Sequence, residues 1–174
     1  MAATSGLWAL TKRSFLPILV ALIWSPILLA EASPILQAKA DAEDGLITIQ
    51  SRFGPKETMQ RLEAAVKAKG FTVFAHVDHS AEATQVNLSL PPTDLLIFGN
   101  PKGGTLLMRF NQTIGIDLPL KALVWQDEKG TTWLSYNDPE WIVRRHGGAP
   151  GTEDTVRTIS SALKVLAANA TSAE

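Results

Sequence analysis

The chain of 174 residues contains no cysteine. Disulfides, thiolate zinc sites, iron–sulfur clusters and cysteine nucleophiles are therefore all excluded. An excess of charge of one sign is missing as well, because 16 Lys and Arg residues face 17 Asp and Glu residues. A net charge of −1 gives no electrostatic support for nucleic-acid binding, which usually relies on a basic surface. We expect no nucleic-acid partner.

Recognisable catalytic motifs are also missing. The sequence has no Gly-x-Ser-x-Gly elbow and no pair of histidines spaced to hold a metal on one helix. We therefore predict no catalytic residue, no metal and no cofactor, and we leave open whether the protein is an enzyme. A hydrophobic content of 45% is enough for one packed domain.

One long uncharged run stands near the start of the chain. It covers residues 14–30 and directly follows Lys12-Arg13. A basic start, an apolar run and a small-residue cleavage site are typical of a secretory signal peptide. Ala30-Glu31-Ala32 follows the run directly, so we expect residues 1–32 to be removed, with cleavage after Ala40 as the alternative. The mature protein is then periplasmic or secreted.

An uncleaved anchor in the inner membrane is the alternative role of residues 14–30. The run of 17 residues is at the short edge of the ~17–25 residues that a spanning helix needs. Pro17 and Pro26 also interrupt it, and proline is unfavourable inside a helix. In this alternative the leader is the only part that contacts the membrane.

The rest of the chain predicts an α+β fold. Residues 33–45, rich in Ala and acidic residues, are expected to be a linker. Apolar patterns predict strands at 46–51, 71–78, 95–98, 118–127 and 131–136. In the second of these strands, Phe71, Val73, Ala75 and Val77 are expected to share one face.

Two longer helices are predicted from apolar residues at helical spacing. The first covers residues 55–69, and the last begins after Thr152. Shorter helical segments are expected at 80–88, 106–110 and 138–146. Hairpin connections predict a mostly antiparallel sheet with helices on one face, in a single domain over 46–168 followed by a tail at 169–174.

Three groups of motifs resemble one family, the domain-of-unknown-function 302 family, over about residues 46–168. They are Phe98-Gly99-Asn100-Pro101-Lys102 with Gly104-Thr105 and Leu107-Met108, Asp117-Leu118-Pro119-Leu120-Lys121 with Val124-Trp125, and Ser135-Tyr136-Asn137-Asp138-Pro139. The resemblance implies a TATA-binding-protein-like β-α-β4-α topology and assembly as a homodimer. It implies no activity and no catalytic residues, and the name of the fold does not imply DNA binding.

The first candidate site is the segment 99–105, expected to be a loop between a buried strand and a helix. Backbone amides at a helix start favour an anion, and Lys102 would add positive charge. The candidate ligand-binding residues are Asn100, Lys102, Gly103, Gly104 and Thr105, and the expected partner is a small anionic ligand. The segment is not a Walker A loop, because Lys102 precedes the glycine pair. A tight turn with purely structural glycines is the alternative.

A second candidate group lies at the end of the strand 71–78. His76 and Asp78 share a strand face, and His79 follows, so these side chains could converge on one ion or ligand. The alternative is an Asp–His hydrogen bond at a strand end. Tyr136, the only tyrosine, could donate a hydrogen bond into a pocket or pack in the core.

Two further groups have structural interpretations. Trp125 and Trp133 flank a hairpin, and we expect them to pair across strands in the core or at a dimer interface. The segment 144–146, Arg-Arg-His, is expected to be a solvated helix end.

Three functions are consistent with these patterns. The preferred one is an exported homodimeric module that binds a small ligand or a partner without catalysis. The second is a small enzyme or metal-dependent protein in which the Asp78/His79 region and Asn100–Thr105 form one pocket. The third is a purely structural dimerisation module that uses an exposed sheet face or edge. Whether the two candidate groups meet at one cavity separates these functions.

Overall fold

The computed structural model describes residues 39–41 and 44–172, so the predicted leader at 14–30 lies outside the described residues. The strands are β1 Lys39–Asp41, β2 Leu46–Gln50, β3 Thr72–Asp78, β4 Thr93–Gly99, β5 Leu120–Gln126 and β6 Thr132–Asn137. The helices are α1 Pro55–Ala68, α2 His79–Gln85, α3 Pro101–Phe110, the 3₁₀ helix η2 Gln112–Ile116, α4 Pro139–Arg145 and α5 Glu153–Thr171. None of these helices is both long enough and apolar enough to span a membrane.

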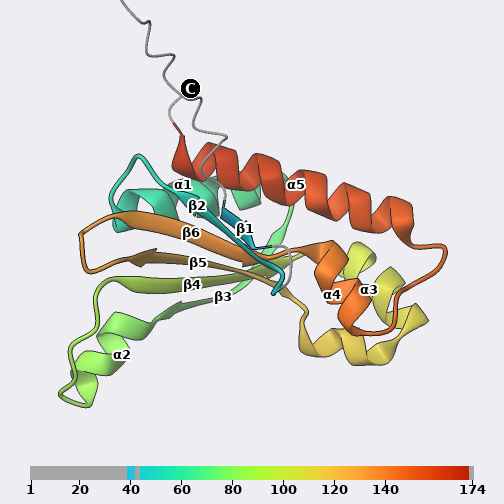
Figure 1. The fold of residues 1–174 in the computed structure, drawn as a ribbon, viewed down its shortest axis with the longest axis horizontal. Coiled ribbons are helices and arrows are strands. Elements are labelled where there is room, and N and C mark those ends of the chain that lie inside the picture. Colours follow the sequence, from blue (N-terminus) through green and yellow to red (C-terminus); the bar gives the residue numbers. More distant parts are fainter. Residues whose placement is uncertain (1–38, 42–43, 173–174) are drawn as a thin grey trace, which may run out of the picture. The chain divides into compact units, whose positions relative to one another are not determined.

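One sheet joins all six strands in the order β1-β2-β6-β5-β4-β3 (Figure 1). Every neighbouring pair in it is antiparallel. The elements β2, α1, β3, β4, β5, β6 and α5 form the predicted β-α-β4-α succession, to which β1, α2, α3, η2 and α4 are added. The predicted α+β fold with a mostly antiparallel sheet is confirmed.

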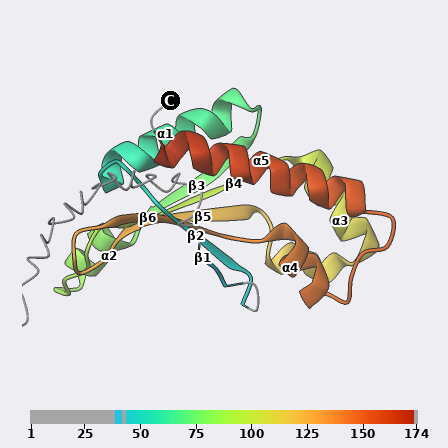
Figure 2. The ribbon, with the colours of Figure 1, turned by 45° about the horizontal axis from the view of Figure 1, so that its top comes forward.

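The core lies between one face of the sheet and the two longest helices. Figure 2 shows α1 and α5 on the same side of the sheet, while α3 and α4 lie near its end. Alternation along β5 places Leu120, Ala122 and Val124 in the core. The helices and the other strands contribute Met59, Leu62, Val66, Leu96, Phe98, Leu134, Tyr136, Val156, Leu163 and Leu166.

Two elements differ from the prediction at the ends of the domain. β1 lies inside the stretch 33–45 that was expected to be a linker. At the other end, α5 extends into the predicted tail as far as Thr171, which is buried and whose carbonyl accepts the N–H of Arg52 at 2.9 Å. Since α5 packs against α1 and its buried Thr171 bonds Arg52, these last turns of helix belong to the folded domain.

A β-bulge in β3 makes the predicted face of that strand wrong beyond Val73. Val73 lies opposite the buried Phe98, whereas Ala75 lies opposite Ile97 on the other face. The extra residue in a bulge is left unpaired and re-aims the side chains that follow. Phe74 is that residue, and its side chain is 53% exposed.

The sheet face opposite α1 and α5 also carries apolar side chains. Leu95 pairs with Leu123 across β4 and β5, and both are half-buried. Trp125 and Trp133 stack there with ring centroids 6.2 Å apart, which confirms their predicted pairing across the hairpin. Neither α1 nor α5 covers this face.

Candidate functional site

The segment 99–105 is mostly helix, so the prediction of a loop followed by a helix at 106 was wrong. Asn100 is the N-cap of α3, and its Oδ1 accepts the N–H of Lys102 at 2.9 Å. Its carbonyl accepts the N–H of Gly104 at 3.0 Å. Asparagine at the N-cap and Pro101 at the first helical position are strong start signals. They outweigh the low helix propensity of the glycine pair.

The two glycines of α3 are not required by the backbone. Neither Gly103 nor Gly104 has a positive φ angle. A Cβ atom on Gly103 would lie 3.8 Å from Ile159 Cδ1, and one on Gly104 would lie 3.6 Å from Leu118 Cδ1, which are ordinary contacts. Alanine would therefore fit at both positions and would favour the helix by about 0.8–1.0 kcal/mol each. What the glycines provide is space beside the helix.

A cavity of about 320 Å³ lies beside the start of α3. This volume is at the lower end of the ~300–1,000 Å³ typical of small-molecule sites. Among the residues that the structure describes, no charged side chain lines the cavity. Its lining consists of Phe71, Phe74, Gly99, Asn100, Pro101, Gly103, Gly104, Thr105, Met108, Leu118, Pro119, Leu120 and Ile159.

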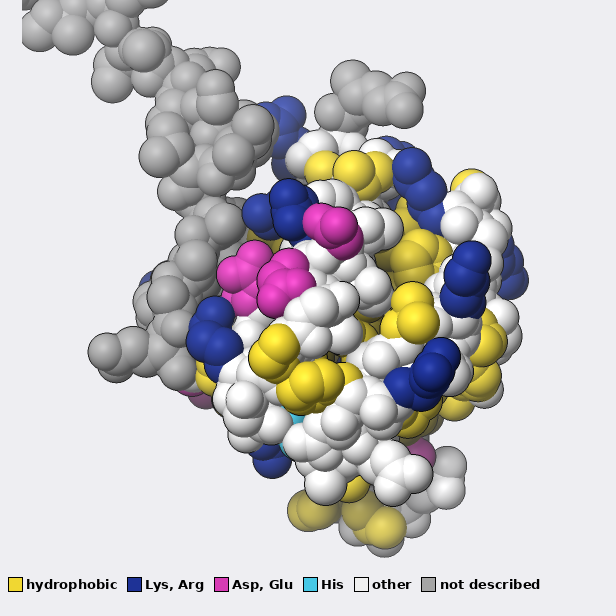
Figure 3. All heavy atoms as spheres, turned by 90° about the vertical axis from the view of Figure 1, so that its right-hand side faces the viewer, with side chains coloured by type: hydrophobic (Ala, Val, Ile, Leu, Met, Phe, Trp, Pro, Cys, Tyr) yellow, Lys and Arg dark blue, Asp and Glu magenta, His cyan; other side chains and the backbone are white. Residues whose placement is uncertain are grey.

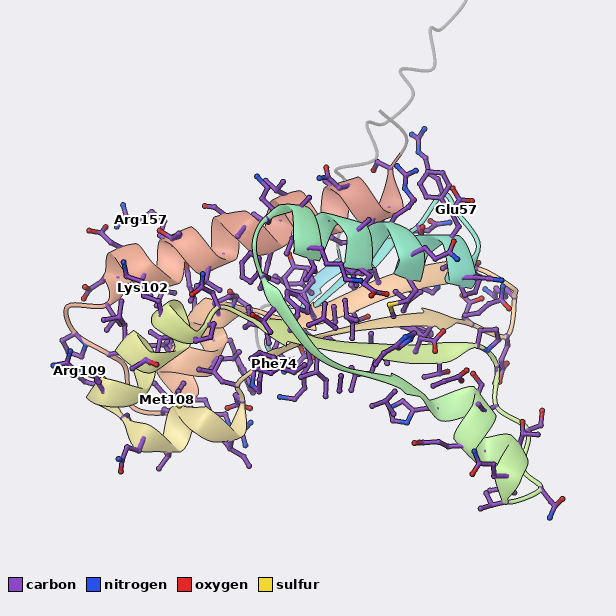
Figure 4. The ribbon with its side chains drawn as sticks, turned by 180° about the vertical axis from the view of Figure 1, so that it is seen from behind. Glu57, Phe74, Lys102, Met108, Arg109 and Arg157 are labelled. Atoms are coloured by element: carbon purple, nitrogen blue, oxygen red, sulfur yellow. The ribbon has the colours of Figure 1, made fainter. Side chains whose placement is uncertain are left out.

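The bulge in β3 brings Phe74 to this cavity. A Cβ atom on Gly99 would lie 3.7 Å from Phe74 Cε2 and 3.5 Å from Pro119 Cβ, which are ordinary contacts, so Gly99 lies between these two walls of the cavity. In Figure 4, Phe74 on β3 and Met108 on α3 lie on the side of the helix away from α5. Figure 3 looks onto this end of the domain and shows apolar atoms exposed between separate basic side chains.

Lys102 lies at the start of α3 but does not line the cavity. It borders an adjoining groove between α3 and α5, together with Asp154, Thr155 and Thr158, and this groove shares Phe71, Asn100, Gly103 and Ile159 with the cavity. Figure 4 shows Lys102 on the α5 side of the helix, near Arg157. Arg157 binds Asp154 at 2.7 Å. Of the predicted ligand residues, the structure therefore brings Asn100, Gly103, Gly104 and Thr105 together at the cavity and leaves Lys102 outside it.

The polar groups at the cavity are hydrogen-bond donors or hydroxyls. Asn100 uses its Oδ1 in the helix cap, which leaves its Nδ2 as a donor. Thr105 adds a hydroxyl group at an exposed position. The site can therefore supply hydrogen bonds to an acceptor atom, but no charge.

Asp78 and His79 lie at the other end of the β3–β4 pair. Thr72 is opposite Gly99, whereas Asp78 is opposite Asp94. Six residue steps of ~3.3 Å separate Thr72 from Asp78, so the two candidate groups are roughly 20 Å apart along the strand. They do not form the single pocket of the enzyme hypothesis.

The polar groups at that far end bond to each other. Asp78 is the N-cap of α2, and its Oδ1 accepts the Ala81 N–H at 2.8 Å and the Ser80 hydroxyl at 2.9 Å. The bond from Ala81, followed by that from Ser80, lowers the pKa of Asp78 below its ordinary value. His79 Nδ1 lies 3.3 Å from Glu82 Oε2.

His76 has a carboxylate neighbour on the adjacent strand. Its Nε2 lies 3.4 Å from Asp94 Oδ1, and Asp94 is also opposite Asp78. Even so, in residues 39–41 and 44–172 no group of three or more His, Cys, Asp or Glu side chains is placed to hold a metal ion.

Tyr136 belongs to the core and does not line the cavity. It is 4% exposed and lies opposite Ile47 on β2 and Ala122 on β5. Burial, and then the nearby charge of Asp138, raises the pKa of Tyr136 to about 12. Its ring therefore packs as the core alternative predicted.

A polar network that was not predicted from the sequence ties η2 to α4. His146 Nε2 lies 2.7 Å from Asp117 Oδ2, and both side chains are about nine-tenths buried. Its Nδ1 lies 2.8 Å from Thr113 Oγ1, and its carbonyl accepts Asn111 Nδ2 at 2.9 Å. Arg145 adds a contact to Asp117 Oδ1 at 3.1 Å. The expected solvated helix end is thus partly buried.

This network supports the wall of the cavity that follows Asp117. Leu118, Pro119 and Leu120 come directly after it and all line the cavity. The only hint of this network in the sequence was Asp117, the first residue of one of the motifs that resemble the family. Nothing local paired it with His146, which lies 29 positions away.

A protein-family model described as "Domain of unknown function DUF302" matches residues 47–166. Among solved structures, the chain resembles the crystal structure of an uncharacterized conserved DUF302 protein from Bacillus stearothermophilus. The TM-score is 0.65 at 24% identity, over 72% of this chain and 98% of that chain. At this identity the likeness establishes the fold alone.

Curated relatives come from Brucella and carry the name of an ion channel. The chain is 50% identical over 104 residues to fluoride-specific ion channel FluC 1 of Brucella suis biovar 1, which covers 60% of this chain and 41% of the relative. The same identity and length hold for FluC 1 of Brucella abortus biovar 1, of which 38% is covered. The chain thus spans about two fifths of the length of these relatives.

Proposed function

The chain belongs to the DUF302 family, whose description assigns no activity, so we propose a function from the site itself. In this proposal the domain binds a small molecule in the cavity at the start of α3 and does not catalyse a reaction. The observation that carries this proposal is the cavity with its glycine-lined helix. Two glycines stand in α3 where alanine would fit and would stabilise the helix. A binding role accounts for that loss of helix stability.

The chemistry of the lining supports binding without catalysis. General acid–base catalysis needs a titratable side chain within hydrogen-bond reach of the reacting group. Within residues 39–41 and 44–172, no Asp, Glu, His, Lys or Tyr side chain lines the cavity. Asp78 and His79, which the enzyme hypothesis would add, lie at the far end of β3.

In this proposal the segment 14–30 directs export, so the domain acts outside the cytoplasm. The alternative is that the same segment stays in the inner membrane as an anchor. Lys12-Arg13 and the uncharged run after it support export. In Brucella, a similar segment occurs in longer chains named for an ion channel, and a channel acts at a membrane. We propose a domain that works at or beyond a membrane, and we do not extend the channel activity to it.

Assembly as a homodimer is part of the same proposal, with the sheet face opposite α1 and α5 as the interface. Leu95, Leu123 and Trp125 give this face an apolar surface. Lys121 Nζ is held by the carbonyls of Asp117 and Pro119 at 3.3 and 3.2 Å. A two-fold contact places the same patch of both copies together, and a mainly apolar patch whose Lys121 ammonium group is already hydrogen-bonded suits it.

Native mass spectrometry of the protein purified from its host tests binding, export and assembly in one spectrum. We expect a dimer of chains that lack residues 1–32, with a small molecule retained. Gly104→Val, which fills the cavity, should lose the retained molecule and keep the subunit number. A wild-type spectrum with no added mass, or the same added mass on Gly104→Val, contradicts the assignment of the cavity.

A charge on the proposed interface tests the dimer separately. Leu123→Glu should give a monomer in analytical ultracentrifugation, because two carboxylates would be buried face to face. Val165→Glu is the matched control, since Val165 is 41% exposed on α5 and lies away from that face. A Leu123→Glu protein that stays dimeric rules out this face.

A further inference from the structure

We infer that the cavity beside α3 takes an uncharged, mainly apolar molecule with a hydrogen-bond acceptor, in place of the anion predicted from the sequence. The inference rests on the proposed function and names the ligand class of the same site. It follows from the charge of the lining, the shape of its walls and the polar groups at its edge.

The lining excludes a charged ligand on energetic grounds. An ionised group loses its hydration when it enters an apolar cavity, and it must find an opposite charge or several hydrogen bonds there. None of the lining residues is charged. Lys102, the cation nearest in sequence, borders the groove with Asp154 on the α5 side of the helix. An anion in the cavity would therefore find no cation among the residues that line it.

The walls suit a flat apolar body. Phe71 is fixed by an edge-to-face contact with the core residue Phe98, with centroids 5.9 Å apart and planes at 83°. Phe74 lies at the cavity with half of its side chain exposed, although it is large and apolar. An aromatic or alicyclic ring on Phe74 would remove that surface from water. Met108 adds an adaptable thioether side chain to the opposite wall.

The edge of the cavity supplies donors to one polar atom of the ligand. Asn100 Nδ2 has no role in the helix cap, and Thr105 carries a hydroxyl. In α3, the N–H groups of Lys102 and Gly104 are already bonded to Asn100. A carbonyl, ether or hydroxyl oxygen on the ligand would use the remaining donors without bringing charge.

Two fluorescent probes with one skeleton test whether the ligand is uncharged and mainly apolar. N-phenyl-1-naphthylamine is neutral, and 8-anilino-1-naphthalenesulfonate is the same skeleton with one sulfonate. We expect the neutral probe to bind the mature domain about tenfold or more tightly than the anionic probe in fluorescence titrations. Displacement by cyclohexanol but not by cyclohexanecarboxylate at neutral pH would extend the result to smaller molecules.

Variants locate the bound probe. Gly104→Val should weaken neutral-probe binding by about tenfold or more, and Phe74→Ala by a smaller factor. Phe74 is exposed, so its removal should leave the thermal unfolding midpoint almost unchanged. Lys102→Ala and Gly54→Ala are controls. Gly54 lies at the start of α1, and a Cβ atom there would contact nothing within 4 Å.

The outcomes separate the inference from the proposed function. If neither probe binds and neither small ring compound protects the protein against thermal unfolding, both fail. If the anionic probe binds as tightly or more tightly, and Lys102→Ala weakens it, the cavity is a site but its ligand class is wrong. If neutral-probe binding survives both Gly104→Val and Phe74→Ala, the probe binds elsewhere and the inference is overturned.

Discussion

The two candidate groups predicted from the sequence lie at opposite ends of the β3–β4 pair. They differ in whether space for a ligand remains next to their hydrogen-bonded polar side chains. At the Asp78 end, the carboxylate caps α2 and bonds Ala81 and Ser80, and His79 lies beside Glu82. At the Asn100 end, a cap of the same kind starts α3, but glycines and apolar side chains leave a cavity next to it.

The difference shows which features of a sequence mark a site in a small domain of this kind. Polar residues that look reactive at the Asp78 end are satisfied by their own helix, which has no buried residue. The glycines at the Asn100 end carry no chemistry, yet they determine where a molecule can fit. In this domain a cavity is a better indicator of a binding site than a polar side chain, because a polar group that is already hydrogen-bonded gains little from a ligand.

The largest expected effect comes from the network that supports the cavity wall. Asp117→Ala removes the partner of His146 and of Arg145 at a site that is nine-tenths buried. We expect a loss of about 2–3 kcal/mol in the free energy of unfolding. Urea unfolding followed by tryptophan fluorescence measures it. Neutral-probe binding should weaken as well, because Leu118 and Pro119 follow directly.

Asp117→Asn is the matched control for that experiment, since its amide oxygen can still accept a hydrogen bond from His146. It should recover part of the lost stability. Equal stability of wild type and Asp117→Ala would mean that the network does not hold η2 against α4. The cavity alone, without a supporting network, would then distinguish the Asn100 end of the β3–β4 pair from the Asp78 end.

An effect of intermediate size, and of opposite sign, is expected from the glycines of α3. The double variant Gly103→Ala, Gly104→Ala should be more stable than wild type by about 1–2 kcal/mol, because alanine favours the helix and its Cβ fits at both positions. Its affinity for the neutral probe should fall. A variant that becomes more stable but binds less tightly is expected where the original residues, here the two glycines, serve binding at the expense of stability.

A double variant that is less stable than wild type would contradict this argument, because the glycines would then be needed for packing. Gly130→Ala gives a contrast within the same chain. Gly130 has φ +79° in the β5–β6 turn, so alanine there should destabilise the protein although its Cβ meets no neighbour.

The fold could be predicted from the sequence because its signals are local. Apolar periodicity located α1 and α5, and Gly130 marked the β5–β6 turn. The bulge at Phe74 could not be predicted, since it depends on how β3 pairs with β4. Part of the cavity lining could also be predicted: Asn100, Gly103, Gly104 and Thr105 were named, but in a loop and together with Lys102, which is not in the lining. The walls from Phe74, Leu118 and Ile159 come from three separate segments.

The smallest expected effect is at Asp78, and it is a pH dependence. The bonds from Ala81 and then Ser80 hold the pKa of Asp78 below its ordinary value of 3.8 in the folded protein. The unfolded chain therefore takes up this proton first as the pH falls. The contribution of Asp78 to stability is complete above the ordinary value and is lost as the pH falls through the folded value.

The amide proton shift of Ala81, followed by NMR from pH 6 downward, should report this titration. Asp78→Asn keeps a good N-cap but has no carboxyl group to protonate, so the shift of Ala81 should then be nearly independent of pH. The same titration in Asp78→Asn would assign the proton to another group. Because α2 buries no residue, we expect neutral-probe affinity to be the same in both proteins, which would confine the ligand to the Asn100 end.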